Sequence, residues 1–292
     1  MNNVNGLTRT CGLIGNPVGH TLSPLIHNTL SEITGTNMMY VPFLCVDGKL
    51  EDAIKGLDAL NILGANVTVP YKNAVIPYLK EVDELAFKMG SVNTLVKIPG
   101  GYKGYNTDMS GLKRAMKSDG VSIEGEKVVI LGSGGVGRAT AFMCAASGAK
   151  KVYLLNRTFD KALSVASEVN KALNTNLVEA LALSDYDKLP DEKFITIQST
   201  SIGLSPNSDV AVIEDDNFYK KVKAGYDLIY NPFETKFMSL VKRNGAPAFN
   251  GLKMLLYQGI DAYERWNDLK ISDKTADKIY KLLKEALNVW SQ

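Results

Sequence analysis

The sequence predicts an α/β protein made of two domains, each built around a mainly parallel sheet. Strand patterns alternate with helix patterns along nearly the whole chain, which is the order that a parallel sheet covered by helices requires. Within residues 127–158, a strand, a glycine-rich turn, a helix and a second strand follow one another as in a βαβ unit. A separate strand–helix series occupies residues 9–110, so the chain carries two such regions.

The elements of the first region follow from local patterns. Short apolar runs rich in β-branched residues predict strands at residues 10–14, 39–44 and 65–69. Helical signals predict helices at residues 24–34, near 49–60 and through 71–89. The Pro-Gly-Gly sequence at 99–101 separates residues 93–98 from 102–106, which predicts a hairpin.

The second region begins near residue 111. Lys127–Leu131 is a short apolar run of the kind expected for a buried parallel strand, and residues 151–155, 194–197 and 224–230 predict three more strands. Residues 273–290 have the apolar spacing of an amphipathic helix. We expect the C-terminal helices to return to the first domain, so that the second domain is an insertion.

The turn after Leu131 has the pattern of a phosphate-binding turn. Gly132 would allow the tight turn, Gly134 would let the backbone approach a pyrophosphate, and Gly137 would let helix and strand pack closely. The N-terminus of the next helix would add amide donors and a positive dipole end. A glycine-rich surface turn is the competing interpretation, but the order of strand, turn and helix favours a dinucleotide site. The candidate cofactor-binding residues here are Gly132, Ser133, Gly134, Gly135, Val136 and Gly137.

The residues after the second strand favour NADP(H) as the cofactor. An NAD site would place a carboxylate there to bind the ribose 2′-hydroxyl, whereas this chain has Asn156, Arg157 and Thr158. The Arg157 guanidinium can bind a 2′-phosphate through two donors. These residues could instead be only the turn before a helix, and Asp160 could reach a ribose or serve the N-terminus of that helix. We expect a Rossmann dinucleotide-binding domain over residues 111–250, and a substrate-binding domain over residues 1–110 and 251–292.

Composition narrows the class of protein. The 292 residues carry a formal net charge of +2, which is too small to indicate a nucleic acid or an anionic membrane as partner. The sequence shows no secretory signal pattern and no apolar run long enough for a membrane span, so we expect a cytoplasmic protein, monomeric or homodimeric. Cys11, Cys45 and Cys144 are widely spaced in apolar contexts, which favours buried thiols over a metal site. With two histidines in the chain, acid–base chemistry is expected from Lys, Asp or Tyr.

Several polar clusters in the first region point to a ligand. Thr21 and Ser23 lie in a loop rich in glycine and proline after a strand, where α/β sheets bind ligands, although Ser23 before Pro24 could be a helix N-cap. Asn66 and Thr68 would share one face of a strand. Lys72 would lie in the first turn of the following helix, where the helix dipole disfavours a cation, so we assign it a function rather than a surface role.

Further polar groups come from four other positions. Asn93 lies in Val-Asn-Thr, and Asp108 follows Tyr-Asn-Thr, where it could instead cap a helix starting near Met109. Lys72 paired with Asp108 would make a cation–carboxylate couple able to move a proton. Tyr230 lies at the end of a predicted strand, and Gln258 would be a buried amide that is either structural or a ligand for a hydroxyl.

Together these blocks resemble the shikimate dehydrogenase family, in order and over nearly the whole chain. The blocks are GNPVGHTLSPLIHN, GANVTVPYK, VNT, YNTD, GSGGVGRA, NRT, YDLIYNP and GLKMLLYQ. The resemblance implies NADPH-dependent reduction of 3-dehydroshikimate to shikimate, in the route to chorismate and the aromatic amino acids, with Lys72 and Asp108 as the catalytic pair. It also implies that Thr21 and Ser23 bind the substrate carboxylate. Asn66, Thr68, Asn93 and Gln258 would then hold ring hydroxyls, with Tyr230 near the carboxylate or nicotinamide.

Two positions depart from the family pattern. Gln198 stands where the family has Asn, in the Gln198–Gly203 block that also contains the candidate cofactor residue Thr200, and Asn250 stands where Asp is common. Asp160 keeps an NAD-linked quinate/shikimate dehydrogenase open as a second candidate. A non-catalytic NADP(H)-sensing regulator on the same fold and a methylene-tetrahydrofolate dehydrogenase also stay open. Retention of Lys72 and Asp108 argues against the regulator, and the hydroxyls of Thr21 and Ser23 suit a small polyhydroxy acid better than a folate.

Overall fold

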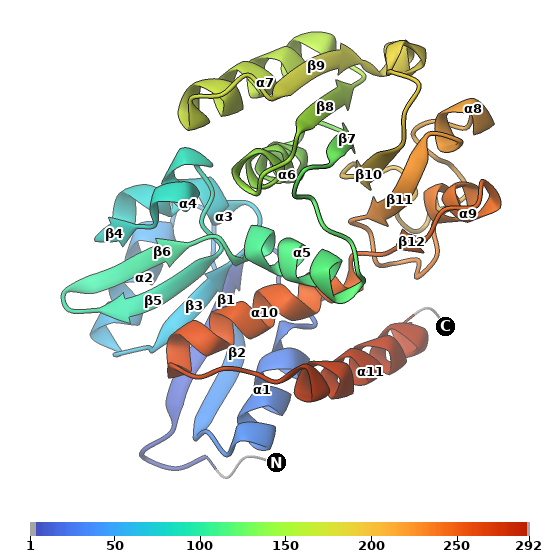
Figure 1. Cartoon of the computed structure of the whole chain (residues 1–292). Helices are drawn as coiled ribbons and strands as arrows, with labels where there is room; N and C mark the ends of the chain where they lie inside the picture. The colour runs from blue at the N-terminus through green and yellow to red at the C-terminus, as the bar shows by residue number, and fades with distance from the viewer. Residues whose placement is uncertain (1–3, 291–292) are drawn as a thin grey trace. The chain divides into compact units, whose positions relative to one another are not determined.

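The computed structural model describes residues 4–290, and the chain divides into two compact units. The chain up to Leu112 together with Leu255–Trp290 forms the first unit, and Lys113–Met254 forms the second. The chain passes from one unit to the other within helices α5 (Thr107–Ser118) and α10 (Leu252–Asn267). Each unit is built on a six-stranded sheet with helices packed against it (Figure 1), so the predicted α/β class is confirmed.

The sheet of the first unit has the order β2-β1-β3-β5-β6-β4. Its strands are β1 (Arg9–Gly15), β2 (Met38–Leu44), β3 (Gly64–Val67), β4 (Glu81–Val82), β5 (Thr94–Ile98) and β6 (Gly101–Tyr105). β1 runs parallel to β2 and β3, whereas β5 runs antiparallel to β3 and β6 in the predicted hairpin. The carboxyl ends of β1, β3 and β6 and the amino end of β5 therefore share one edge of the sheet.

Both faces of this sheet are covered. Ala65 and Val67 of β3 pack into the cluster that contains Ile54 and Leu57 of helix α2 (Leu50–Ala59). The opposite face packs against helix α1 (Ser23–Thr34) and α10, where the ring of His27 stacks on Tyr40 and the ring of Trp266 lies tilted against both. Helix α11 (Asp273–Trp290) lies against α1, and its bounds are those of the helix predicted at residues 273–290. Asn66, between Ala65 and Val67, consequently faces the aromatic side of the sheet.

The helical stretch predicted at residues 71–89 is not continuous in the structure, so this prediction is wrong. The structure has a single turn of α3 (Tyr71–Ala74), a 3₁₀ turn (Ile76–Tyr78), strand β4 and helix α4 (Glu84–Lys88). Pro77 lies in the 3₁₀ turn and lacks the N–H that a longer helix would use. Asp83 then accepts hydrogen bonds from Leu85 N and Ala86 N and starts α4 as its N-cap. The strand predicted at 65–69 also ends early, at Val67.

The second unit has six parallel strands in the order β12-β11-β10-β7-β8-β9. They are β7 (Lys127–Leu131), β8 (Lys151–Asn156), β9 (Val178–Ala182), β10 (Phe194–Gln198), β11 (Val222–Asp227) and β12 (Ala248–Phe249). Its helices are α6 (Gly135–Ala146), α7 (Phe159–Leu173), α8 (Asp216–Tyr219) and α9 (Lys236–Arg243), with a 3₁₀ segment at Leu183–Lys188 (Figure 1). Residues 128–131 are fully buried, as a strand covered on both faces should be.

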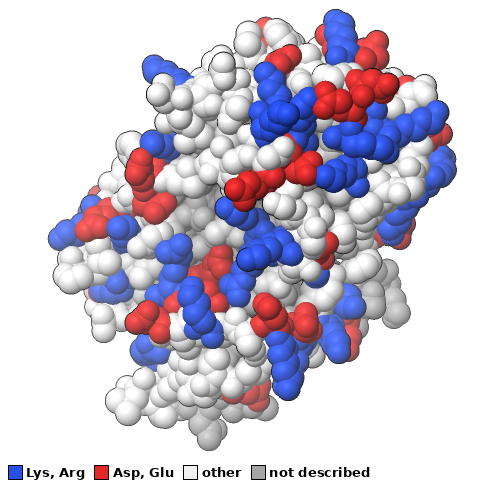
Figure 2. All heavy atoms as spheres, viewed as in Figure 1, with Lys and Arg blue, Asp and Glu red and all other residues white. Residues whose placement is uncertain are grey.

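Composition-based expectations can be compared with the described residues. No helix within residues 4–290 is long and apolar enough to cross a membrane. Cys11, Cys45 and Cys144 are free and buried, and the described part of the chain has no group of three metal-ligating side chains. Lysine and arginine side chains intermix with aspartate and glutamate over the face shown in Figure 2, in keeping with the small net charge.

Candidate active site

The candidate substrate residues of the first unit gather at one edge of its sheet. Thr68 N donates to Ile14 O at 2.9 Å and Asn16 N donates to Val69 O at 3.1 Å, so the ends of β1 and β3 continue side by side. A side chain at Gly15 would meet the methyl group of Thr68 at 2.3 Å, so glycine permits this close approach. The loop that carries Thr21 and Ser23 therefore leaves the sheet next to the segment that carries Thr68 and Lys72.

Lys72 and Asp108 form the predicted pair. Lys72 Nζ lies 2.6 Å from Asp108 Oδ2, and their side chains are 31% and 18% exposed, so the pair is shielded yet reachable by a small ligand. The argument from the helix dipole fails, because α3 is a single turn of four residues, in which Lys72 belongs to the last turn as well as to the first. Asp108 does not cap α5; instead Asn106 Oδ1 accepts a hydrogen bond from Met109 N at 3.3 Å. The Asp108 carboxylate is thus left for Lys72.

Thr21 and Ser23 are placed by a turn rather than by the predicted cap. Ser23 is the first residue of α1, its N–H donates to Thr21 Oγ1 at 3.1 Å, and the N-cap position is Leu22. The expectation that Ser23 could be the N-cap is therefore wrong, and Pro24 follows in the first turn. The turn fixes the two hydroxyl-bearing residues relative to each other, as one carboxylate-binding group would require.

Asn93 presents an oriented amide at the same edge. Its Oδ1 accepts from Thr107 N at 2.7 Å and from Thr94 Oγ1 at 3.0 Å. Because a backbone N–H can only donate, the atom facing Thr107 must be the oxygen, and the Asn93 amino group points the other way. That amino group has no hydrogen bond to a described residue, so it can donate to a ligand. Asn66, in contrast, uses both of its N–H groups inside the protein.

Gln258 lies where helices α5 and α10 approach closely. A Cβ at Gly111 would meet Gln258 N at 2.5 Å, so α5 can carry no side chain at that position. Gln258 is buried, and its Nε2 donates to Leu255 O at 2.8 Å, which leaves Oε1 without a hydrogen bond to a described residue. Tyr230 belongs to the second unit, three residues beyond β11, and burial raises the pKa of its hydroxyl.

The two histidines of the chain have different surroundings. His27 is fully buried in α1, and its ring stacks on Tyr40 with 4.2 Å between centroids. Burial lowers the pKa of His27 to about 3, so the ring is neutral at neutral pH. His20 is exposed on the loop before α1.

The glycine turn of the second unit fits a pyrophosphate. Gly132 has a φ of +104°, which favours glycine. A Cβ at Gly137 would meet Gly132 O at 2.1 Å, whereas the Cβ positions of Gly134 and Gly135 have no neighbour within 4 Å. Helix and turn therefore pack without space for a side chain at Gly137, and the open backbone at Gly134 leaves room for a ligand.

The segment after β8 completes the candidate cofactor site. Asn156 Oδ1 accepts from Ser133 N at 3.2 Å and Asn156 Nδ2 donates to Thr158 O at 2.9 Å, so Asn156 joins the turn to Arg157 and its neighbours. Arg157 is exposed and has no ion pair or hydrogen bond to the described residues, and Val136 is exposed at the start of α6. Ser133 Oγ is buried and has no hydrogen-bond partner among residues 4–290. An unpaired hydroxyl and a free guanidinium beside an open backbone fit a phosphate-bearing cofactor.

The two departures from the family pattern have local explanations. Gln198 is fully buried: its Oε1 accepts from Thr200 N at 2.5 Å and its Nε2 donates to Asp227 Oδ1 at 3.2 Å. Thr200 lies against Gly132, at 2.6 Å from the position a Cβ there would take, so Gln198 supports a loop beside the glycine turn. Asn250 Nδ2 donates to Phe233 O at 2.7 Å, a bond that an aspartate could not make.

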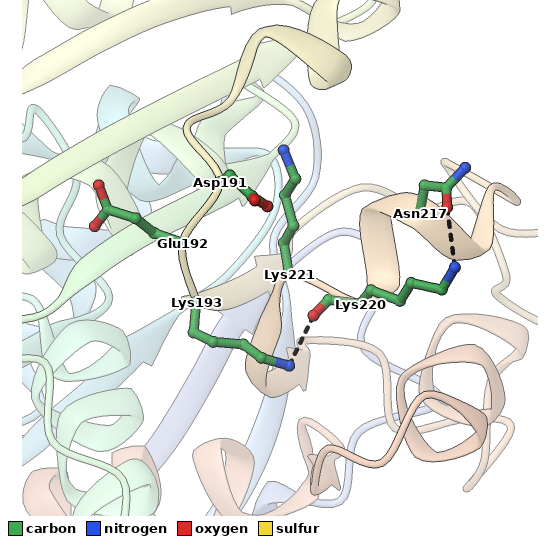
Figure 3. Close-up of a pocket in the computed structure, with 6 residues that line it drawn as sticks. All are labelled: Asp191, Glu192, Lys193, Asn217, Lys220 and Lys221. Atoms are coloured by element: carbon green, nitrogen blue, oxygen red, sulfur yellow. Dashed lines mark hydrogen bonds between the residues drawn. The ribbon is translucent and has the colours of Figure 1, made fainter.

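A surface hollow in the second unit does not serve this site. Figure 3 shows its six lining residues, which are Asp191, Glu192, Lys193, Asn217, Lys220 and Lys221. Lys193 Nζ donates to Lys220 O at 2.7 Å, and Lys221 Nζ donates to Leu189 O at 2.8 Å, so these cations are already bound by the backbone. Lys193 and Lys221 precede β10 and β11, at the amino edge of the sheet, whereas the glycine turn follows the carboxyl end of β7.

Comparisons with known proteins agree with this geometry. The protein-family model of the shikimate dehydrogenase substrate binding domain matches residues 13–95. The protein-family model of shikimate / quinate 5-dehydrogenase matches residues 113–213. Shikimate dehydrogenase (NADP(+)) of Moorella thermoacetica is 38% identical over 289 residues, covering 99% of this chain and 97% of the relative. The chain belongs to the shikimate dehydrogenase family.

Other members of the shikimate dehydrogenase family are similarly close. Shikimate dehydrogenase (NADP(+)) of Bacillus cereus is 42% identical over 259 residues, covering 87% of this chain and 91% of the relative. A crystal structure of shikimate 5-dehydrogenase from Listeria monocytogenes in complex with shikimate and NAD has a TM-score of 0.90. That structure is 29% identical and covers 97% of this chain and 99% of its own chain.

Sequence reasoning missed the residues that support the site. No sequence motif assigns a chemical role to these residues, which are Tyr40, Thr94, Thr107 and Gly111. Thr94 and Thr107 do stand inside the Val-Asn-Thr and Asn-Thr-Asp blocks. Their hydrogen bonds and close contacts depend on which strands and helices are neighbours. The repeated Asn-Thr pair is a signal in the sequence that could have found Thr94 and Thr107, whereas Tyr40 and Gly111 have no such signal.

Proposed function

We propose that this protein is a shikimate dehydrogenase that catalyses the reversible, NADPH-dependent reduction of 3-dehydroshikimate to shikimate. The observation that carries the proposal is the shielded contact of 2.6 Å between Lys72 Nζ and Asp108 Oδ2 at a sheet edge lined by hydroxyl and amide groups. Membership of the shikimate dehydrogenase family supports the choice of substrate.

The first unit offers the groups that a polyhydroxy acid needs. The hydroxyls of Thr21 and Ser23, fixed by their shared turn, would bind the substrate carboxylate. The unpaired amino group of Asn93, the hydroxyl of Thr68 and the amide oxygen of Gln258 would bind ring hydroxyls. Tyr230, from the second unit, is proposed to contact the carboxylate or the nicotinamide.

Lys72 and Asp108 would handle the proton. NADPH, when bound, supplies the hydride for the ketone carbon. One proton must also reach the ketone oxygen, and the Lys72 side chain, held by its hydrogen bond of 2.6 Å to Asp108 Oδ2, would donate it. Asp108 would keep the ammonium oriented and accept a hydrogen bond from a neighbouring substrate hydroxyl. Neutral His27 is buried among aromatic rings and takes no part.

The second unit would hold NADP(H). The backbone at Gly132, Gly134 and Gly135, with the Ser133 hydroxyl, would bind the pyrophosphate at the start of α6. Arg157 would bind the 2′-phosphate, with Asn156 and Thr158 shaping its segment. Thr200 would line the adjacent loop. Asp160 lies in the first turn of α7, where a carboxylate suits the helix dipole.

The experiment that tests this function is a matrix of two acids against two cofactors. Shikimate or quinate is mixed with NADP⁺ or NAD⁺, and formation of the reduced cofactor is followed by absorbance. We expect the highest kcat/KM for shikimate with NADP⁺. Preference for quinate and NAD⁺ would support an NAD-linked quinate/shikimate dehydrogenase, while cofactor binding without turnover of either acid would support a regulator.

A further inference from the structure

We propose that Tyr40, Asn66, Thr94 and Thr107 form a buried hydrogen-bonded chain that positions Asn93 and Asp108, and that Asn66 acts through this chain rather than by touching the substrate. The inference rests on the proposed function, because it explains how the reacting groups of that function are held. Each member of the chain is at most 4% exposed.

The chain begins at Tyr40 on β2. Its hydroxyl donates to Asn66 Oδ1 at 2.8 Å, reaching across β1, which lies between β2 and β3 in the sheet. Because an amide oxygen can only accept, the Tyr40 hydroxyl is the donor of this bond, and burial raises the pKa of that hydroxyl well above its ordinary value. The ring is itself held by its stack on His27.

The side chain of Asn66 on β3 binds the start of the neighbouring strand β5. Its Nδ2 donates to Asn93 O at 3.2 Å and to Thr94 Oγ1 at 3.1 Å. A backbone carbonyl can only accept, so the amide cannot be turned round without losing bonds at both ends. Both N–H groups of Asn66 are used, and one lone pair of its oxygen is taken by Tyr40, which leaves it no donor for a ring hydroxyl.

Thr94 and Thr107 carry the chain to the catalytic pair. Their hydroxyls lie 2.8 Å apart, and each is also within hydrogen-bond distance of Asn93 Oδ1, at 3.0 and 3.2 Å. The two threonine hydroxyl oxygens and Asn93 Oδ1 therefore form one compact group, in which the two hydroxyl protons make the hydrogen bonds. Thr107 is the first residue of α5 and directly precedes Asp108, so this group fixes where the Asp108 helix starts.

The same segment also holds Lys72. Val92 N donates to Lys72 O at 2.8 Å, and the next residue, Asn93, binds the start of α5 through its side chain. Residues 92–94 are therefore a common frame for the lysine and the aspartate. Displacement of this frame would change the Lys72–Asp108 separation and the direction of the free Asn93 amino group together.

Two matched variants test the role of Tyr40. Tyr40→Phe and Tyr102→Phe each remove one hydroxyl from a ring that is 1% exposed, since Tyr102 donates to Ile62 O at 2.7 Å away from the candidate site. We expect both to lower the urea midpoint by similar amounts. Only Tyr40→Phe should lower kcat/KM for shikimate, by about threefold to tenfold, the range that one lost hydrogen bond gives.

A second pair tests the hydroxyl group next to Asp108. Thr107→Val keeps the shape and removes the hydroxyl, and we expect kcat to fall about tenfold while KM for NADP⁺ stays within about twofold. Thr107→Ser restores the hydroxyl and should recover most of kcat. A crystal structure of Thr107→Val should show Lys72 Nζ and Asp108 Oδ2 out of hydrogen-bond contact, a readout that needs no turnover.

The outcomes separate this inference from the proposed function. A wild-type protein that oxidises neither acid would overturn the proposed function, and the crystallographic comparison would still decide the role of the chain. Full activity in both Tyr40→Phe and Thr107→Val, or an intact Lys72–Asp108 contact in the Thr107→Val crystal, would overturn the inference. Equal losses of kcat/KM in Tyr40→Phe and Tyr102→Phe would also overturn it, because they would mark a general effect of stability.

Discussion

Replacing Lys72 by methionine should reduce turnover far more than it reduces stability. Methionine keeps the unbranched length of the side chain and removes the ammonium that lies 2.6 Å from Asp108. With side chains 31% and 18% exposed, the pair resembles a partly solvated ion pair, for which about 1 kcal/mol of stability is typical. A positioned acid contributes about a hundred- to ten-thousandfold in rate, or roughly 3–5 kcal/mol of barrier. The chemical effect should therefore dominate.

The assay is steady-state oxidation of shikimate by NADP⁺, with cofactor binding measured separately by fluorescence titration. Lys97→Met is the matched control, because Lys97 Nζ pairs with Asp58 at 2.5 Å in the same unit, with side chains 24% and 46% exposed. We expect Lys72→Met to lower kcat at least a hundredfold, with cofactor binding intact and Lys97→Met near wild type. If Lys72→Met turned over within a few fold of wild type, the proton would have to come from a tyrosine or bound water.

Three further predictions concern the second unit. Arg157→Ala should raise KM for NADPH about ten- to a hundredfold and leave KM for NADH unchanged, and equal changes for both cofactors would reject the 2′-phosphate contact. Burial raises the pKa of Asp227 to about 6, so between roughly pH 4 and 6 the folded protein binds more protons than the unfolded chain. The free energy of unfolding should therefore fall as pH rises through that window. When this free energy is measured by urea unfolding at several pH values, it should depend less steeply on pH in Asp227→Asn than in the wild type. Gly137→Ala places a Cβ 2.1 Å from Gly132 O and should weaken NADP⁺ binding at least tenfold in a fluorescence titration, whereas Gly56→Ala in the first unit, with open space around it, should leave binding unchanged.

The parts of the fold that depend on local pattern can be predicted from the sequence. The strand Lys127–Leu131 is predicted to the residue, because an apolar run followed by a glycine turn and a helix former has few other solutions. Residues 71–89 are predicted poorly, since several good helix formers hide the effects of Pro77 and of the Asp83 cap. Helix propensity is a weak guide where such breaks occur.

Some residues of the candidate site can likewise be predicted from the sequence and others cannot. Lys72 and Asp108 can be paired because both stand in recognisable blocks, and the structure brings them into contact. The argument that uses the helix dipole for Lys72 nevertheless fails, because the helix is a single turn. The bond from Tyr40 to Asn66 could not be predicted, since it depends on strand order and on β1 lying between the two residues. Sequence patterns identify reacting groups more readily than the groups that hold them.

The bond from Thr107 to Asn93 should protect the start of α5 against local opening. The first N–H groups of a helix have no partner within the helix, so helix starts commonly open and exchange their amide hydrogens early. Here the Thr107 amide is bound to a buried side-chain oxygen at 2.7 Å, within a group of oxygens shielded from water. The start of α5 is thereby expected to open only with the sheet itself. Asp108, one residue later, would then stand on one of the least mobile helix ends of the first unit.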